Sequence, residues 1–401
     1  MRPRYRDACA CVKRSRTLGL VHPLFALALV VVAGIGVTRL SRFPPRYSAL
    51  FDDLVVTGAP YVLLGALLGP GLGILDVTGM HLLEPLLALG IGWIGAAFGA
   101  RIEWRMLRTV PRRVWWMGLA LALPVFLACS LAAWFLARNV PPLADAWQPK
   151  WPAILTLAAA ATMSAAWSGP KLARRTALLD TIFGTVAAGA ALVLYQPIRG
   201  TVATLVASAA LGALCTWLLR PSRQQDTMGI VVQLFGVILS GSGLAYATGL
   251  SPFFVCGLTT AFAVNGSDVA TRHVIAKLLS RWERPLYAAF LILAGALLGP
   301  LTVWLLPAGL ALAAVRIAVR WGTVRLGGMR AWSPLHGLTP DFGFETARQG
   351  GTALAVAAGF DLVRGAIGGA TLATVLIMIL VGEAIVAATP LTALARQAEV
   401  T

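Results

Sequence analysis

The sequence predicts an all-α polytopic membrane protein with about 13 transmembrane helices. Of the 401 residues 58% are hydrophobic and 12% are charged, and the mean hydropathy is +0.79. Soluble domains carry about 25% charged residues, so this chain has too few charges to cover a soluble surface. Its apolar runs also reach about 18 to 22 residues, the length that crosses a hydrocarbon core of about 30 Å.

Apolar segments long enough to be helices follow one another along the chain. They lie at 20–38, 57–75, 82–100, 114–137, 151–168, 176–196, 199–219, 228–249, 251–267, 285–299, 301–320, 345–362 and 365–390. The polar stretches between them, such as 101–113, 268–284 and 321–344, are too short to bury a core of their own. We therefore expect a basic tail at 1–19, one transmembrane domain at 20–390 and a short tail at 391–401.

The positive charge of the chain predicts its orientation in the membrane. Lys and Arg number 33 against 16 Asp and Glu, a net charge of +17 that in a soluble protein would indicate nucleic-acid binding. Here the basic residues lie between apolar segments, and cytoplasmic loops are the ones with excess Lys and Arg. With a cytoplasmic C-terminus, the loops on that side hold 22 basic residues and the opposite loops hold four. The larger set includes Arg101, Arg105, Arg108, Arg112, Arg113, Lys171, Arg174, Arg175, Arg272, Lys277, Arg316, Arg320, Arg325 and Arg330, and the smaller set is Arg138, Lys150, Arg199 and Arg364.

The basic tail at 1–19 disagrees with this orientation, because an odd number of helices places it outside. Two interpretations remain open. Either the first helix acts as an uncleaved signal anchor and the helix count near 39–56 is wrong, or the tail extends a chain that naturally starts later.

Catalytic and metal-binding motifs are missing from the sequence. The five Cys and four His residues are scattered, without a CxxC or HxxxH pair, so we expect neither a resident metal nor a disulfide framework. The sequence shows no nucleophile and base pair and no phosphate loop. We therefore expect no cofactor, no nucleic-acid partner and no enzymatic activity.

Helix-breaking residues interrupt the apolar segments at four places, 65–76, 162–175, 240–252 and 344–356. Irregular backbone at membrane depth is tolerated only where protein or a water-filled cavity satisfies the freed N–H and C=O groups, so these breaks point to the transport pathway. The alternative is that small residues let helices pack closely. That alternative is weakest at 344–356, where Arg348 adjoins Gly350 and Gly351.

Carboxylates inside apolar segments are the candidate functional groups, because intramembrane charge is costly. Asp180 lies in the segment at 176–196, where burial disfavours the charged form and lets a carboxylate exchange a proton for a cation. Its alternative role is to complement the helix dipole near Arg174 and Arg175. Glu383 is explained more readily by a packing hydrogen bond, and Glu84 by its position at a helix start.

The order of seven segments carries a family resemblance. They are GAPYVLLGALLGPGLGILD, LLEPLLALGIGWIGAAFGARIEWRML, SGPKLARR, the helix with Asp180, GLSPFFVCGLTTAFAV, RPLYAAFLILAGALL and RQGGTALAVAAGF. In this order, from about residue 57 to 390, they resemble the transmembrane domain of monovalent cation:proton antiporters. The resemblance implies an inverted-repeat fold in which the fifth and twelfth helices are broken and cross, and a homodimer with the second helix at its surface.

The resemblance also implies a site. The sixth helix supplies the ion-binding aspartate, here Asp180, with oxygens from Ser164, Ser168 and Thr181 and from carbonyls of the broken helices. Arg348, Gly350 and Gly351 would support the break, and we expect Arg348 to be held by Glu345, by Asp180 or by carbonyls at the crossing.

Some positions depart from the family pattern. Leu179 stands where the family usually has Asn, Asp or Gln, and Arg348-Gln349-Gly350-Gly351 replaces an Arg-Gly-Glu motif. No charged residue follows Arg284 in the tenth helix, where electrogenic members tend to have lysine. We find no segment within these 401 residues that resembles the family's soluble nucleotide-binding domain.

The predicted function is antiport of Na+ or K+ against protons by a multi-pass protein of a bacterial plasma membrane, with the lipid bilayer as its surroundings. The transported cation is the only metal ion expected. The alternative is a non-transporting membrane scaffold or sensor that keeps this fold, which the missing polar neighbour of Asp180 favours.

Overall fold

The structure is a computed structural model that describes residues 59–71, 77–165, 171–196, 198–218, 227–296, 304–330, 333–336, 338, 341–365 and 369–388. All regular structure in these ranges is helical. The tails predicted at 1–19 and 391–401, the helix predicted at 20–38 and Ser168 lie outside the described residues.

Helices occupy each apolar segment predicted from residue 57 onward. Their bounds are α3 (Ala59–Ala66) with a π-helical turn η2 (Leu67–Gly71), α4 (Val77–Ala100), α5 (Trp104–Thr109), α6 (Arg112–Asn139), α7 (Pro141–Ala146), α8 (Lys150–Thr162), α9 (Lys171–Tyr195), α10 (Ile198–Leu218), α11 (Thr227–Thr248), α12 (Pro252–Gly266), α13 (Val269–Ala296), α14 (Leu305–Gly328), α15 (Asp341–Glu345), α16 (Gly351–Val363) and α17 (Ala370–Ala388). Five of the described helices, α6, α9, α10, α11 and α14, are long and apolar enough to cross a membrane. The chain is therefore an integral, multi-pass membrane protein.

One helix differs clearly from the sequence prediction. The stretch 268–284, expected as a polar loop, is the first half of α13. Ile275, Leu278 and Leu279 recur at helical spacing and are buried against α4 and α11, whereas Lys277 is exposed. The charges of this stretch therefore lie on the solvent face of an amphipathic helix, which a search for uniformly apolar runs does not detect.

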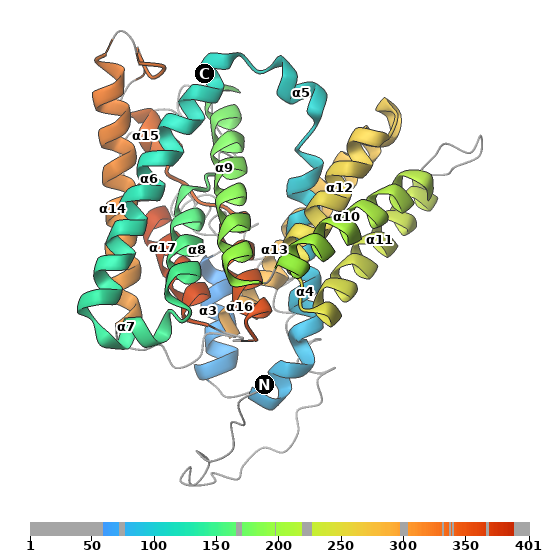
Figure 1. The fold of residues 1–401 in the computed structure, drawn as a ribbon, viewed down its shortest axis with the longest axis horizontal. Helices are drawn as coiled ribbons and strands as arrows, with labels where there is room; N and C mark the ends of the chain where they lie inside the picture. The colour runs from blue at the N-terminus through green and yellow to red at the C-terminus, as the bar shows by residue number, and fades with distance from the viewer. Residues whose placement is uncertain are drawn as a thin grey trace, which may run out of the picture.

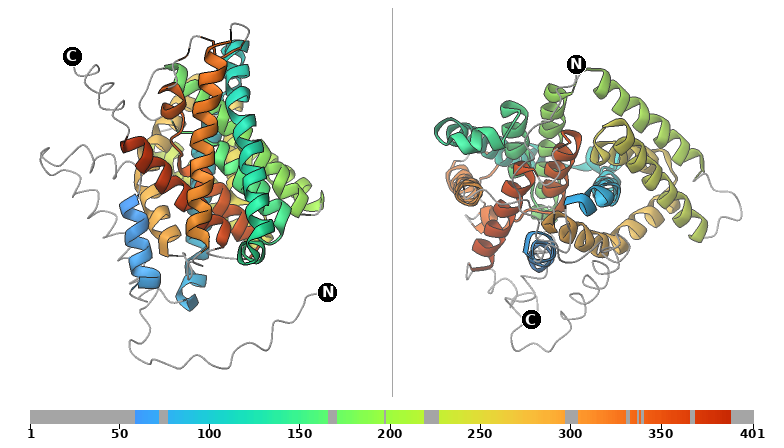
Figure 2. Two further views of the ribbon diagram at one scale, coloured as in Figure 1. Left: turned by 90° about the vertical axis from the view of Figure 1, so that its left-hand side faces the viewer. Right: turned by 90° about the horizontal axis from the view of Figure 1, so that it is seen from below.

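The helices form two bundles that lie side by side (Figure 1). The first bundle contains α3, α4, α10, α11, α12 and α13, and the second contains α6, α8, α9, α14, α16 and α17. In Figure 2, α14 lies beside α6 along the outer side of the second bundle. The bundles meet where α16 packs on α4, so the helix predicted to be broken lies at the boundary between them.

Two of the four predicted breaks are packing sites in the first bundle. Gly65 and Gly69 face α13 so closely that a Cβ at Gly65 would lie 2.0 Å from the carbonyl oxygen of Ile292. The segment 240–252 does not interrupt a helix at membrane depth, because α11 continues to Thr248. Gly65 and Gly69, and in the second segment Gly241 beside Cys256, therefore serve close helix packing.

The two ends of the molecule carry different residues of the orientation prediction, which itself stays a prediction. Figure 1 shows α5 and α15 at one end of the molecule and α7 at the other. The α5 end also carries the start of α6, so Arg112 and Arg113 lie there, and Arg113 donates to the carbonyl oxygens of Pro334 and His336. Arg138 and Lys150 flank α7 in the sequence. We call these the α5 end, predicted to be cytoplasmic, and the α7 end.

Candidate functional site

Two stretches of extended backbone meet inside the second bundle. Helix α8 ends at Thr162, and α16 begins only at Gly351, although a helix was predicted from 345. Gly350 is extended, with φ −112° and ψ −178°. The backbone N–H of Ala165 donates to the carbonyl oxygen of Arg348 at 2.8 Å, so the two stretches are hydrogen-bonded where they cross. The remaining two predicted breaks therefore interrupt helices inside the protein.

The last carbonyl groups of α8 are satisfied by side chains from other helices. A helix end leaves four carbonyl oxygens without intrahelical partners, and a buried one is costly. Here Gln349 Nε2 donates to Ala160 O at 2.9 Å, Arg316 Nε to Ala161 O at 2.7 Å, Arg320 Nη2 to Thr162 O at 2.6 Å and Arg316 Nη2 to Met163 O at 3.2 Å. Each of the carbonyl groups at 160–163 thus has a side-chain donor.

Arg316 and Arg320 also hold the second extended stretch. Arg316 Nη1 donates to the carbonyl oxygen of Ala347, and Arg320 Nη1 donates to that of Thr346 at 2.7 Å. The two arginines are four residues apart on α14, so they lie on the same helix face, and they are 1% and 0% exposed. They therefore join both broken segments to α14 and place two fixed positive charges at the crossing.

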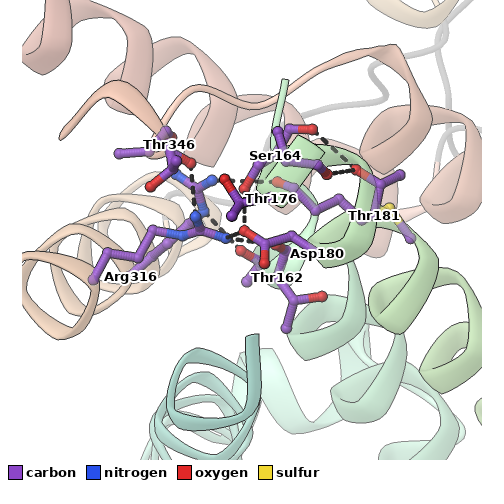
Figure 3. A network of polar contacts seen from close by, with 12 residues as sticks. Thr162, Ser164, Thr176, Asp180, Thr181, Arg316 and Thr346 are labelled. Atoms are coloured by element: carbon purple, nitrogen blue, oxygen red, sulfur yellow. Dashed lines mark hydrogen bonds and ion pairs between the residues drawn. The ribbon is translucent and has the colours of Figure 1, made fainter. Parts of the chain in front are cut away.

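Asp180 lies at this crossing and is fully buried. Its Oδ2 is 2.9 Å from Arg320 Nη2 and accepts a hydrogen bond of 3.0 Å from the Ser164 hydroxyl (Figure 3). The Thr181 hydroxyl donates to Ser164 O at 2.9 Å. The other carboxylate oxygen, Asp180 Oδ1, has no hydrogen-bond partner among the described residues. The site thus offers one free, negatively charged oxygen beside two hydroxyl groups.

A cavity of about 600 Å³ reaches this site from the α5 end. Ser164, Thr181, Gly350 and Gly351 line it next to the crossing. Its lining also includes Arg101, Glu103, Met106, Arg174 and Arg175, of which Arg174 and Arg175 are exposed. The cavity therefore connects the surface at the α5 end with the residues that contact Asp180.

Comparison with solved structures gives a clear match. No protein-family model and no curated protein sequence match the chain. A structure of the sodium proton antiporter MjNhaP1 from Methanocaldococcus jannaschii at pH 8 matches with a TM-score of 0.62 and 15% sequence identity. The match covers 92% of this chain and 99% of that one. The chain has the fold of sodium/proton antiporters.

The match confirms the predicted all-helical, antiporter-like fold in the described residues, which include a crossing of broken segments next to α8 and α16; the count of about 13 helices stays a prediction. The fold brings Asp180, Ser164 and Thr181 together, and Gly350 and Gly351 line the cavity beside them. Asp180 is the tenth residue of α9, and the first turn of that helix has no acidic residue. Complementing the helix dipole, the alternative role for Asp180, therefore does not apply.

Of the three partners predicted for Arg348, the structure contradicts one, Asp180, and the pairing of Arg348 with Glu345 stays a prediction. The Arg348 carbonyl oxygen supports the crossing, but Asp180 pairs with Arg320 instead. The Arg348 side chain is partly exposed, and it forms no ion pair with a carboxylate among the described residues. The side chain of Glu345 lies outside the described residues. Support of the broken helices thus comes from the side chains of Arg316 and Arg320.

Arg316 and Arg320 were assigned to a cytoplasmic loop from the sequence, and that assignment is wrong. Both lie inside α14, which ends only at Gly328. Their four-residue spacing within the apolar run ALAAVRIAVRWG is the signal that identifies them, because one helix face carrying both charges needs buried partners. Glu383 accepts a hydrogen bond from the Gln349 backbone at 3.2 Å, which is the packing role expected for it.

The departure at Leu179 has a packing explanation. Leu179 is 1% exposed and belongs to an apolar cluster with Leu107 and Val114. A Cβ on Gly118 of α6 would lie 2.8 Å from the Leu179 Cβ. Leu179 therefore faces α6 rather than the free oxygen of Asp180, and a polar side chain there would lie among apolar ones.

Proposed function

We propose that the chain is a secondary active antiporter that exchanges Na+ or K+ for protons, with Asp180 binding either ion in turn. The observation that supports this most strongly is the free Oδ1 of a fully buried carboxylate next to a cavity that reaches the surface. The similarity in fold to a sodium proton antiporter agrees with it. On this proposal the protein moves ions across a lipid bilayer and is not an enzyme.

The ligands of the cation follow from which oxygens remain available. The carbonyl groups at 160–163 already accept hydrogen bonds from side chains, three of them from arginine (Arg316 and Arg320), and the positive charge of the arginines disfavours a cation on these oxygens. Asp180 Oδ1 and the hydroxyl oxygens of Ser164 and Thr181 remain. Hard monovalent cations bind carboxylate and hydroxyl oxygens, and both hydroxyl side chains line the cavity.

The buried charges favour an exchange of one cation for one proton. Arg316 and Arg320 are balanced by Asp180 and Glu383, all of which are less than 10% exposed. A proton or a monovalent cation on Asp180 raises the charge of this cluster by the same amount, so both loaded states have the same net charge. An empty, ionised Asp180 remains paired with Arg320. If Asp180 is the exchanging group, transport is electroneutral.

Transport by purified protein tests this proposal. Proteoliposomes with a trapped pH-sensitive dye receive Na+, K+ or Li+ on one side, and the internal pH is followed. An antiporter changes the internal pH when a transported cation is added. If the rate of this pH change does not depend on an imposed membrane potential, the exchange is electroneutral. No pH change with any of the cations would favour the alternative, a non-transporting scaffold or sensor.

The oligomeric state and the orientation in the membrane are also proposals. Homodimerisation rests on the family resemblance, with α3 as the expected surface, where Leu63 and Leu67 are exposed. A cytoplasmic C-terminus in a bacterial plasma membrane rests on the distribution of basic residues. Mass measurement of the protein in detergent tests the dimer.

A further inference from the structure

A second buried carboxylate lies on α16, away from the crossing. Asp361 is 1% exposed and follows Gly351, the first residue of α16, by ten positions, which is about 15 Å along the helix at 1.5 Å per residue. Arg364 donates to the carbonyl oxygen of Gln148, in the segment between α7 and α8, so this end of α16 lies near the α7 end. Asp361 is therefore not part of the cavity or of the Asp180 site.

The Asp361 carboxyl group takes the place of a helix cap for α17. Its Oδ2 accepts a hydrogen bond of 2.8 Å from the backbone N–H of Leu372, near the start of that helix. The residue before α17 is Gly369, which has no side chain to cap the helix. A Cβ there would lie 2.5 Å from the carboxyl carbon of Asp361. The glycine thus leaves room for a cap that comes from another helix.

The second carboxyl oxygen is not satisfied. The Thr371 hydroxyl is close enough to act on the carboxyl group but outside hydrogen-bonding geometry, so that neither Asp361 Oδ1 nor Thr371 Oγ1, both buried, has a hydrogen-bond partner among the described residues. An ionised carboxylate can only accept hydrogen bonds, whereas a protonated one also donates. A proton on Oδ1 would give this oxygen an acceptor in Thr371 and would remove an unpaired buried charge.

The surrounding charges offer the ionised form little compensation. Arg364 is the charged group that acts on Asp361, but it donates to the carbonyl oxygen of Gln148. Among the described residues, the helices packed against α16 carry few charged groups. On α4 there is Glu84, which accepts a hydrogen bond from Tyr246, and on α17 there is Glu383, which accepts one from Gln349. Helix α8 has Lys150 at its exposed start, α9 has Arg174, Arg175 and Asp180, and the described part of α12 has no charged group. The side chain of His81 on α4 lies outside the described residues.

We propose that Asp361 is a second proton-binding site, which holds its proton on Oδ1 at neutral pH while Oδ2 accepts the N–H of Leu372 at the start of α17. The site is separate from Asp180 and does not depend on the proposed transport function. Loss of the proton in alkaline solution would leave an unpaired buried charge near the end of α16, the helix that begins at the crossing.

Infrared spectroscopy of the purified full chain tests the proposal directly, because a protonated carboxyl group has a C=O stretch apart from the amide bands. The spectrum at neutral pH should lose one such band in Asp361→Asn. The control is Asp145→Asn, the same change at an exposed residue of α7, which should leave the band in place. An unchanged protonated-carboxyl region in Asp361→Asn would overturn the proposal.

A second variant keeps the test decisive if Asp361→Asn does not fold. Thr371→Val keeps the shape of the side chain but removes the proposed acceptor of the proton. The carboxyl band should then move to higher frequency while remaining present, as expected for loss of a hydrogen bond from the acid. If Thr371→Val leaves the band at the wild-type frequency, the proton does not bind between these two groups and the proposed site is wrong.

Discussion

Replacing Arg320 by alanine is expected to be one of the most damaging single changes in the second bundle. The side chain is 0% exposed, pairs with Asp180 at 2.9 Å and donates to the carbonyl oxygens of Thr162 and Thr346 at 2.6 and 2.7 Å. Removing one partner of a buried ion pair costs about 3 to 5 kcal/mol. Each buried carbonyl group left without a donor adds about 1 to 3 kcal/mol unless water replaces the donor.

Thermal unfolding in detergent, followed by size-exclusion chromatography, measures this loss. The matched control is Arg325→Ala, an exposed arginine on the same helix that stacks on Trp321 and for which a change of at most about 1 kcal/mol is expected. The double variant Arg320→Ala/Asp180→Asn should regain part of the stability, because the buried negative charge is removed together with its partner. Equal stability of Arg320→Ala and Arg325→Ala would refute the role of Arg320 at the crossing.

Three further predictions concern the cavity, the orientation and the crossing. Arg174→Gln/Arg175→Gln should lower the apparent KM for a cation added on the cavity side about fourfold at low salt, because the repulsion of the cation by two positive charges at about 10 Å in water is about 0.8 kcal/mol. An effect that persists at high salt would exclude simple charge repulsion. Cysteine introduced at Arg108 should escape an impermeant thiol reagent in intact cells, and labelling would show that the orientation is inverted. Arg348→Ala should keep near wild-type yield and transport, and a loss as large as that of Arg320→Ala would restore Arg348 as a support of the crossing.

The helices were predictable because hydrophobic length dominates a membrane chain. Uniform apolar runs located the helices from residue 57 onward to within a few residues, except where a helix is broken inside the apolar run, as at α8 and α16, or continues beyond it. Helix α13 is the example of the second case, since its first half buries Ile275 and Leu278 but exposes Lys277. Breaks were harder to interpret, because Gly65 serves packing between two continuous helices while Gly350 lies close to Ala165 where two extended segments cross, and the sequence alone gives both the same signal.

The carboxylate of the site could be predicted from the sequence, whereas the two arginines that surround it could not. Asp180 stands out because carboxylates are rare in apolar segments, and the resemblance added Ser164 and Thr181. Arg316 and Arg320 were counted as loop charges, since arginine near a helix end normally marks the cytoplasmic side. Their role depends on carbonyl groups at the end of α8 and at residues 346–347, and these two segments are more than 150 residues apart in the sequence. Only the folded chain brings those acceptors together.

The central claim is that Asp180 binds the cation and the proton in turn, and transport by Asp180→Asn tests it most directly. The asparagine keeps the shape of the side chain but cannot titrate, so proteoliposomes with this variant should show no cation-driven pH change although the protein remains monodisperse. In the wild type, the apparent affinity for the cation should weaken as the pH falls, because protons compete for the same oxygen. Exchange by Asp180→Asn at the wild-type rate, with the same pH dependence, would contradict the account and move the exchanging group to another carboxylate.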